Sequence, residues 1–145
     1  MKVVVQRVER ASVRVADRML GQIGGGLLVL AGFSPTDTEE TLRWMAEKIV
    51  GLRVFADSDG RMNLDLAAAG GSLLVVSQFT LYGDVSRGRR PSFVDAAPPE
   101  QARGLYDRFL AICAEGESPV AAGEFGGMMD VELVNAGPVT LIIEH

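Results

Sequence analysis

The strongest constraint on the fold is a period-two alternation of side chains in the first 20 residues. In residues 2–8, KVVVQRV, the side chains of Val3, Val5 and Arg7 alternate with those of Val4, Gln6 and Val8. In residues 12–20, SVRVADRML, Val13 and Val15 alternate with Arg14 and Ala16. This pattern is typical of strands in an antiparallel sheet with one buried face, because successive strand side chains point to opposite faces. ADRM, at residues 16–19, is expected to form a turn between short strands.

Later apolar runs predict further strands. LLVLAG (residues 27–32) follows three glycines and has no polar alternation, which predicts a central strand covered on both faces. GGSLLVVSQFTLYGD (residues 70–84) predicts another buried strand. VELV (residues 131–134) and VTLIIEH (residues 139–145) are expected to close the sheet as a pair. The Gly137-Pro138 dipeptide between them is unexpected, because Asn-Gly or Asp-Gly suits a hairpin better.

Two segments change to helical spacing. The first runs from a cap at Thr36 or Asp37 to about Gly51, and the second begins at Pro98 and Pro99. Their apolar faces comprise Leu42, Met45, Ile49 and Leu52 in the first and Ala102, Leu105, Phe109 and Cys113 in the second. The cysteine is therefore expected to be a core thiol. We expect one mixed α/β domain, residues 1–145, with an antiparallel-rich sheet and two main helices packed outside.

Composition limits the functional classes. The net charge of -5 and pI near 4.9 argue against a nonspecific nucleic-acid binder, which would carry a broad basic surface. A local basic patch remains possible at Arg87, Arg89 and Arg90, although a solvated loop with scattered arginines explains them equally well. The single cysteine fits a reducing compartment, and the N-terminus lacks a secretory pattern. We therefore expect a cytoplasmic protein that does not enter the membrane.

The inventory of catalytic side chains is short. His145 is the only histidine, and we expect it to be loosely held, which disfavours triad chemistry. We expect no cofactor and no metal site, because no zinc or calcium spacing occurs. What remains is a polar cluster where a buried strand ends: Ser77, Gln78, Phe79 and Thr80. A strand end can aim backbone N–H donors at a substrate carbonyl. Simple capping of the strand explains the same residues.

Two short stretches carry a resemblance to a known family. SQFTL (residues 77–81) and NAGPVT (residues 135–140) resemble the two signature motifs of the D-aminoacyl-tRNA deacylases. QRVERASV, IGGGLLVLAG, MNL, RPSF and GLYDRF are similar to family segments in the same order. The resemblance implies a barrel-like sheet and a homodimer with active sites at the subunit interface. It further implies hydrolysis of the ester between tRNA and a D-amino acid or glycine, without a cofactor.

The resemblance also implies a role for each site residue. Thr80 and the backbone around Phe79 would polarise the ester, Phe79 would stack on the terminal adenine, and Ser77 and Gln78 would shape the adenosine pocket. The Gly137-Pro138 peptide would be cis and enter the partner's active site, where its carbonyls reject L-substrates. The remaining implied contacts are Met129 in the pocket and Arg87, Arg89 and Arg90 on tRNA. Ala136 departs from the Asp of many relatives, and FGGMMD departs from the usual pattern before Met129.

Two other functions stay open at the sequence level. The strand-end cluster suits a noncatalytic module that binds a nucleotide or a peptide. Thr80 or Ser77 could also act as the nucleophile of a small-ester hydrolase, although neither has an evident base.

Overall fold

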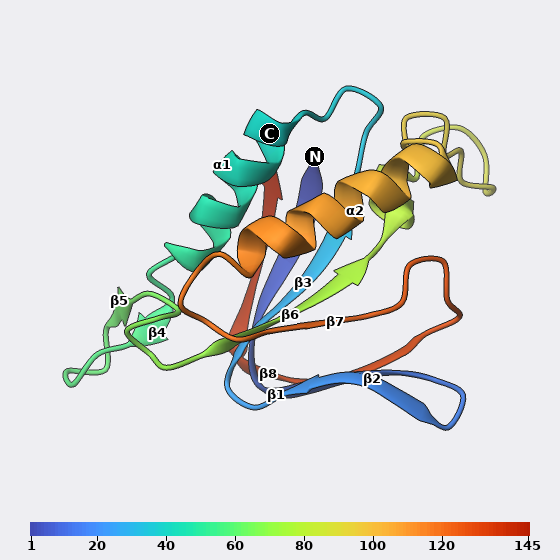
Figure 1. Ribbon diagram of the computed structural model, residues 1–145. Helices are drawn as coiled ribbons and strands as arrows, with labels where there is room; N and C mark the ends of the chain where they lie inside the picture. The colour runs from blue at the N-terminus through green and yellow to red at the C-terminus, as the bar shows by residue number, and fades with distance from the viewer.

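The computed structural model describes residues 1–145 and shows a curved six-stranded sheet with two long helices packed on one side (Figure 1). The sheet order is β2-β1-β3-β6-β7, and β8 pairs with β1; β4 and β5 form a separate hairpin. The strands are β1 (Lys2–Val15), β2 (Arg18–Ile23), β3 (Gly26–Gly32), β4 (Phe55–Ala56), β5 (Met62–Leu64), β6 (Ser72–Ser77), β7 (Val120–Ala122) and β8 (Asp130–Glu144). The helices are α1 (Glu39–Val50) and α2 (Pro99–Cys113), with a short 3₁₀ turn, η1 (Phe79–Tyr82).

The long strand β1 organises the sheet. Its first half pairs with β3, its second half pairs with β2, and β8 runs antiparallel along it at both ends. The strand at one edge, β2, also approaches the strand at the other edge: a Cβ on Gly21 would lie 2.9 Å from the carbonyl oxygen of Ala122 in β7. The sheet is therefore nearly closed, and the expected mixed α/β, barrel-like fold class is confirmed.

The central strands are buried on both faces, as their unbroken apolar sequences predict. β3 pairs with β6 and β6 with β7, both in parallel, through connections that contain α1 and α2. One apolar cluster fills the space between sheet and helices, and a second contains buried residues of β1, β2, β3 and β6. Burial on both faces makes the end of β6 a rigid platform.

The helices begin close to the expected residues, with one correction. The N-cap of α1 is Thr38, whose hydroxyl accepts from the backbone N–H of Thr41, rather than Thr36 or Asp37. Asp37 does not cap, because its carboxylate accepts from Ser34 and from the terminal ammonium of Met1. The α2 helix begins at Pro99 and buries Cys113, as expected, but its inward face also contains Tyr106 and Ile112, which the sequence reading left out.

The end of the chain departs from the expected strand pair. Residues 131–134 and 139–145 do not pair with each other, because both belong to one strand, β8, and pair with β1. The strand is also less buried than its apolar sequence suggests, and the Ile142 side chain is 77% exposed. Gly137-Pro138 therefore interrupts a continuous strand, and its peptide bond is cis.

Both chain ends are held in place, so the expectation of a loose His145 is wrong. The His145 ring stacks on Trp44 with ring centroids 4.0 Å apart, and its carbonyl accepts from the Met1 ammonium at 2.7 Å. Neither helix is long and apolar enough to cross a membrane.

Candidate active site

The first part of the candidate site lies where β6 ends. The backbone N–H of Gln78 donates to Ala31 at 2.7 Å, and the chain then turns into η1. Burial decreases along this segment: Ser77 and Gln78 are half-buried, while Phe79 and Thr80 are exposed. The predicted strand therefore stops at Ser77, and the other polar side chains stand beyond a rigid strand end. The Gln78 amide donates to the Thr80 hydroxyl, which orients that hydroxyl.

Phe79 is an aromatic side chain displayed at the surface. Its side chain is 56% exposed and belongs to neither apolar cluster. It contacts the Phe93 ring edge to face, with centroids 5.0 Å apart and planes at 66°. An exposed ring beside a hydroxyl and an amide is suited to stacking on a nucleobase.

Met129 lies at the same end of β6. It packs beside the cluster that contains Val76, and a Cβ on Gly123 would lie 2.7 Å from its sulfur atom. The Tyr106 hydroxyl supports this end of the sheet by donating to the carbonyls of Val75 at 3.0 Å and Gly123 at 3.3 Å. Burial raises the pKa of Tyr106 to about 12, so this donor keeps its proton at neutral pH. Sequence reasoning missed Tyr106, although it lies one position after Leu105 on the expected helix face.

The second part of the candidate site is a bulge in β8. Asn135 pairs with Val8 and Thr140 pairs with Gln6, so residues 136–139 lie opposite Arg7 alone. The extra residues loop outward, and Gly137 and Pro138 are exposed. The Asn135 side chain closes the loop by accepting from the Val139 N–H at 2.9 Å and donating to the Thr140 hydroxyl at 2.9 Å.

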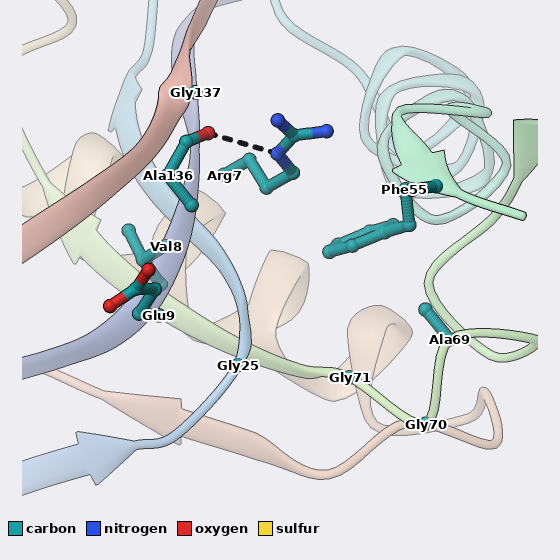
Figure 2. Close-up of a pocket in the computed structure, with 11 residues that line it drawn as sticks. Arg7, Val8, Glu9, Gly25, Phe55, Ala69, Gly70, Gly71, Ala136 and Gly137 are labelled. Carbon is teal, nitrogen blue, oxygen red and sulfur yellow. Dashed lines mark hydrogen bonds between the residues drawn. The ribbon is translucent and has the colours of Figure 1, made fainter. Parts of the chain in front are cut away.

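Arg7 holds the bulge from the side, as Figure 2 shows. Its Nε donates to the Ala136 carbonyl at 2.9 Å, and its Nη1 donates to the Val54 carbonyl. The guanidinium leaves no space for a side chain at Gly137, where a Cβ would lie 2.8 Å from Nη2. Sequence reasoning did not assign Arg7 a role. The available signal was the period-two spacing, which places the charged Arg7 on the same face of the strand as Val3 and Val5, and these two face the core.

A shallow cavity of about 440 Å³ borders this bulge. Glycine and alanine residues form much of its wall, with Phe55 on one side and Arg7 on another (Figure 2). It does not include the strand-end residues Ser77 to Thr80.

The two parts are far apart within one chain. The bulge lies opposite Arg7, and Arg7 is in register with Leu27 and Leu73, four residues before Ser77. Four strand residues span about 13 Å, and the three strand spacings from β8 to β6 add about 14 Å sideways. One protomer therefore cannot bring Gly137 to Thr80.

The basic residues lie on a loop beyond η1. A pair of backbone hydrogen bonds between Asp84 and Ser92, at 2.8 and 2.9 Å, closes this loop, and Arg87, Arg89 and Arg90 are exposed within it. Hydrogen bonds from Ser86 lower the pKa of the Asp84 carboxyl, which stabilises the ionised form that caps the turn. The loop follows directly from the strand end that carries Phe79 and Thr80.

Comparison with known proteins identifies the family. The family model described as D-Tyr-tRNA(Tyr) deacylase matches residues 4–144. The chain belongs to this family. A D-aminoacyl-tRNA deacylase from Desulfatibacillum aliphaticivorans is 56% identical over 144 residues, which cover 99% of each chain.

Solved structures share the fold of this chain. A structure described as c-Myc DNA Unwinding Element Binding Protein has a TM-score of 0.94 and 42% identity and covers 100% of this chain and 99% of its own. A probable eukaryotic D-amino acid tRNA deacylase has a TM-score of 0.84 at 20% identity, over 98% of this chain and 97% of its own. The second likeness concerns the fold alone.

Proposed function

We propose that this deacylase-family chain hydrolyses the ester of D-aminoacyl-tRNA and releases the free D-amino acid and tRNA. The observation that carries the proposal is the family match over residues 4–144, which includes both motifs. In both motifs, polar groups or main chain stand exposed on a rigid support. Glycyl-tRNA is a second substrate of the same site, because glycine has no side chain for a chirality filter to exclude.

We infer that the working unit is a homodimer. The two motifs lie too far apart to act together in one chain, whereas a twofold axis between them would bring each to the partner's other motif. Val4 pairs with Ile142 of β8 on one side and with Leu30 of β3 on the other. Along the strand direction, this row of three residues lies between the two motifs. Ile142 is 77% exposed, and Val4 and Leu30 are half-buried. A partner that covers this row would remove apolar surface from water.

The bulge would serve as the chirality filter in the partner's site. Arg7 and Asn135 fix its main chain, and an immobile carbonyl can bind the substrate amino group while it crowds the position of an L side chain. The D-enantiomer directs its side chain elsewhere. Rejection then comes from main chain, so it does not depend on the identity of the amino acid.

Chemistry would take place at the strand end of the other protomer. Thr80 and the backbone N–H groups around Phe79 would polarise the ester carbonyl, with Gln78 holding the Thr80 hydroxyl. Phe79 would stack on the terminal adenine, while Ser77 and Met129 shape the adenosine pocket. The neighbouring ribose hydroxyl of the tRNA would assist attack, so the protein needs mainly to orient the ester.

Contact with the tRNA would be limited to its acceptor end. The exposed Arg87, Arg89 and Arg90 lie on the loop that leaves the strand end and can reach nearby phosphates. Since the net charge is -5, the rest of the surface gives little general attraction for RNA. A small number of phosphate contacts predicts a modest salt dependence of binding.

The test is release of tyrosine from D-tyrosyl-tRNA and L-tyrosyl-tRNA by the purified full chain. We expect turnover of the D-ester, turnover of glycyl-tRNA, and no significant acceleration of L-ester hydrolysis. A folded dimer that leaves D-tyrosyl-tRNA intact would overturn the proposal.

A second candidate function is nucleic-acid binding without turnover. It is favoured by the 42% identical structure, whose description names a DNA-element-binding protein. The acidic charge of this chain disfavours extended duplex contact. Tight, sequence-dependent binding of duplex DNA together with no esterase activity would favour this candidate instead.

A further inference from the structure

Phe93 occupies an unusual position next to the strand end. It lies outside both apolar clusters, and its ring contacts the exposed Phe79 ring edge to face at a centroid distance of 5.0 Å. The same ring lies against the end of η1, where a Cβ on Gly83 would be 3.0 Å from its Cε1 atom. Phe93 therefore contacts η1 at both its first residue, Phe79, and its C-cap, Gly83.

The backbone around Phe93 is fixed on both sides. Ser92, just before it, exchanges two backbone hydrogen bonds with Asp84. After it, Ala96 donates to the Phe93 carbonyl at 3.1 Å, and Ala97 donates to the Phe33 carbonyl at 2.8 Å. The Phe93 ring is thus carried on a pinned backbone, whereas the Phe79 side chain is 56% exposed.

We propose that Phe93 is a positioning residue for deacylation, which holds the Phe79 ring in the orientation that receives the terminal adenine. This inference rests on the proposed function, because it assigns Phe93 an effect on the substrate through Phe79. Edge-to-face aromatic pairs have a preferred geometry, so an aromatic ring at position 93 restricts the ring at position 79 more than an aliphatic side chain would. The two backbone hydrogen bonds between Ser92 and Asp84 fix the main chain next to Phe93, where the arginine-bearing loop ends.

The test compares Phe93→Leu, Phe93→Tyr, Phe79→Leu and the double variant Phe79→Leu/Phe93→Leu. We expect Phe93→Leu to lower kcat/KM on D-tyrosyl-tRNA about tenfold, which corresponds to about 1.4 kcal/mol. Phe93→Tyr keeps the ring and should remain within about twofold of the parent. In the Phe79→Leu background, Phe93→Leu should cost nothing further, because the ring that it positions is gone.

A shorter substrate separates positioning from support of the loop. With D-tyrosyl-adenosine, which lacks the rest of the tRNA, Phe93→Leu should lose the same factor. Arg89→Ala/Arg90→Ala should lose activity on the tRNA substrate only. The inference is overturned if Phe93→Leu keeps the parental rate, if its loss is confined to tRNA, or if the two leucine substitutions act additively.

Two further measurements keep the outcome clear. Thermal unfolding should change little in Phe93→Leu, because the ring lies outside both cores. If that variant misfolds, Phe93→Met replaces it as the non-aromatic variant.

Inactivity of the unaltered protein would count against the proposed function. Titration of the parent and the non-aromatic variant with AMP would then decide the inference about Phe93. Weaker AMP binding in the non-aromatic variant supports positioning by Phe93, and equal binding contradicts it.

Discussion

The strand end at Ser77 to Tyr82 and the bulge at Gly137 present their chemistry in opposite ways. At the strand end, buried β6 and β3 fix the main chain, and the side chains of Phe79 and Thr80 stand exposed. At the bulge, the side chains of Arg7 and Asn135 fix the loop, and main chain stands exposed. The comparison teaches that side-chain hydrogen bonds can fix the main chain of an exposed Gly-Pro loop, as neighbouring strands fix the end of β6.

The largest expected effect tests whether the two regions must meet across an interface. Ile142→Glu places a charge in the exposed apolar row and should shift the protein to monomers, because burying an unpaired carboxylate is unfavourable. Since one protomer cannot bring Gly137 to Thr80, deacylation should be lost. Sedimentation and turnover of D-tyrosyl-tRNA would be measured together. A monomer with full activity would contradict the composite site.

The next effect addresses the main chain of the bulge. Gly137→Ala introduces a Cβ at a strained φ of +130° and 2.8 Å from the Arg7 guanidinium, so either the loop or the Arg7 side chain that holds it must move. We expect a loss of at least about 100-fold in turnover, since a 1 Å misplacement near a site can cost that much. Gly60→Ala is the matched control, because Gly60 has a φ of +77° and nothing within 4 Å. Equal activity losses in the two variants would remove the case for a filter at Gly137.

The Arg7 side chain tests how the bulge is held. Arg7→Met leaves the carbonyls of Ala136 and Val54 without their donor, which should cost about 1 to 3 kcal/mol of stability. We expect the preference for D-tyrosyl-tRNA over L-tyrosyl-tRNA to fall about tenfold, in line with a loss of that size. Arg14→Met, at an exposed position of the same strand, should leave both quantities unchanged. An unaltered preference in Arg7→Met would show that Asn135 is sufficient to hold the loop.

Side chains at the strand end should have a smaller effect. Thr80→Ala removes one hydroxyl hydrogen bond of about 1 kcal/mol and should lower kcat about fivefold, while backbone donors maintain the remainder. Ser77→Ala should lower it less. The unaltered enzyme should accumulate no acyl intermediate on rapid quenching. A trapped acyl-Thr80, or complete inactivity of Thr80→Ala, would instead favour the small-ester hydrolase that the sequence left open.

The smallest effect concerns support beneath the strand end. Tyr106→Phe removes hydrogen bonds to Val75 and Gly123, which should lower stability by about 1 kcal/mol. Burial raises the pKa of Tyr106 to about 12 from 10.0, so its stabilising effect is complete below about pH 10 and is lost as pH rises toward 12. Tyr106→Phe should therefore flatten the alkaline decline measured by urea unfolding. Tyr82 and Cys113, whose pKa values burial also raises to about 12, contribute to the same decline. An unchanged slope would contradict this role for Tyr106.

The sequence predicted more of the fold than of the side chains that hold the candidate site in place. Local patterns were sufficient for β3, β6 and both helices, because periodicity and caps are encoded by neighbouring residues. The single strand β8 was not predicted, because its two halves are joined by pairing with β1 rather than by any local signal. Arg7 and Tyr106 were missed as supports for the same reason: their partners lie 129 and 31 residues away along the chain.

Complementation between subunits that carry different defects tests the composite site most directly. Gly137→Ala protomers would be mixed with Phe79→Ala/Thr80→Ala protomers, and turnover of D-tyrosyl-tRNA would be compared with that of each parent after exchange. If each site takes its filter from one protomer and its strand end from the other, every heterodimer contains one intact site, and random mixing restores about a quarter of the sites. Heterodimers that form but turn over no faster than either parent would contradict the account.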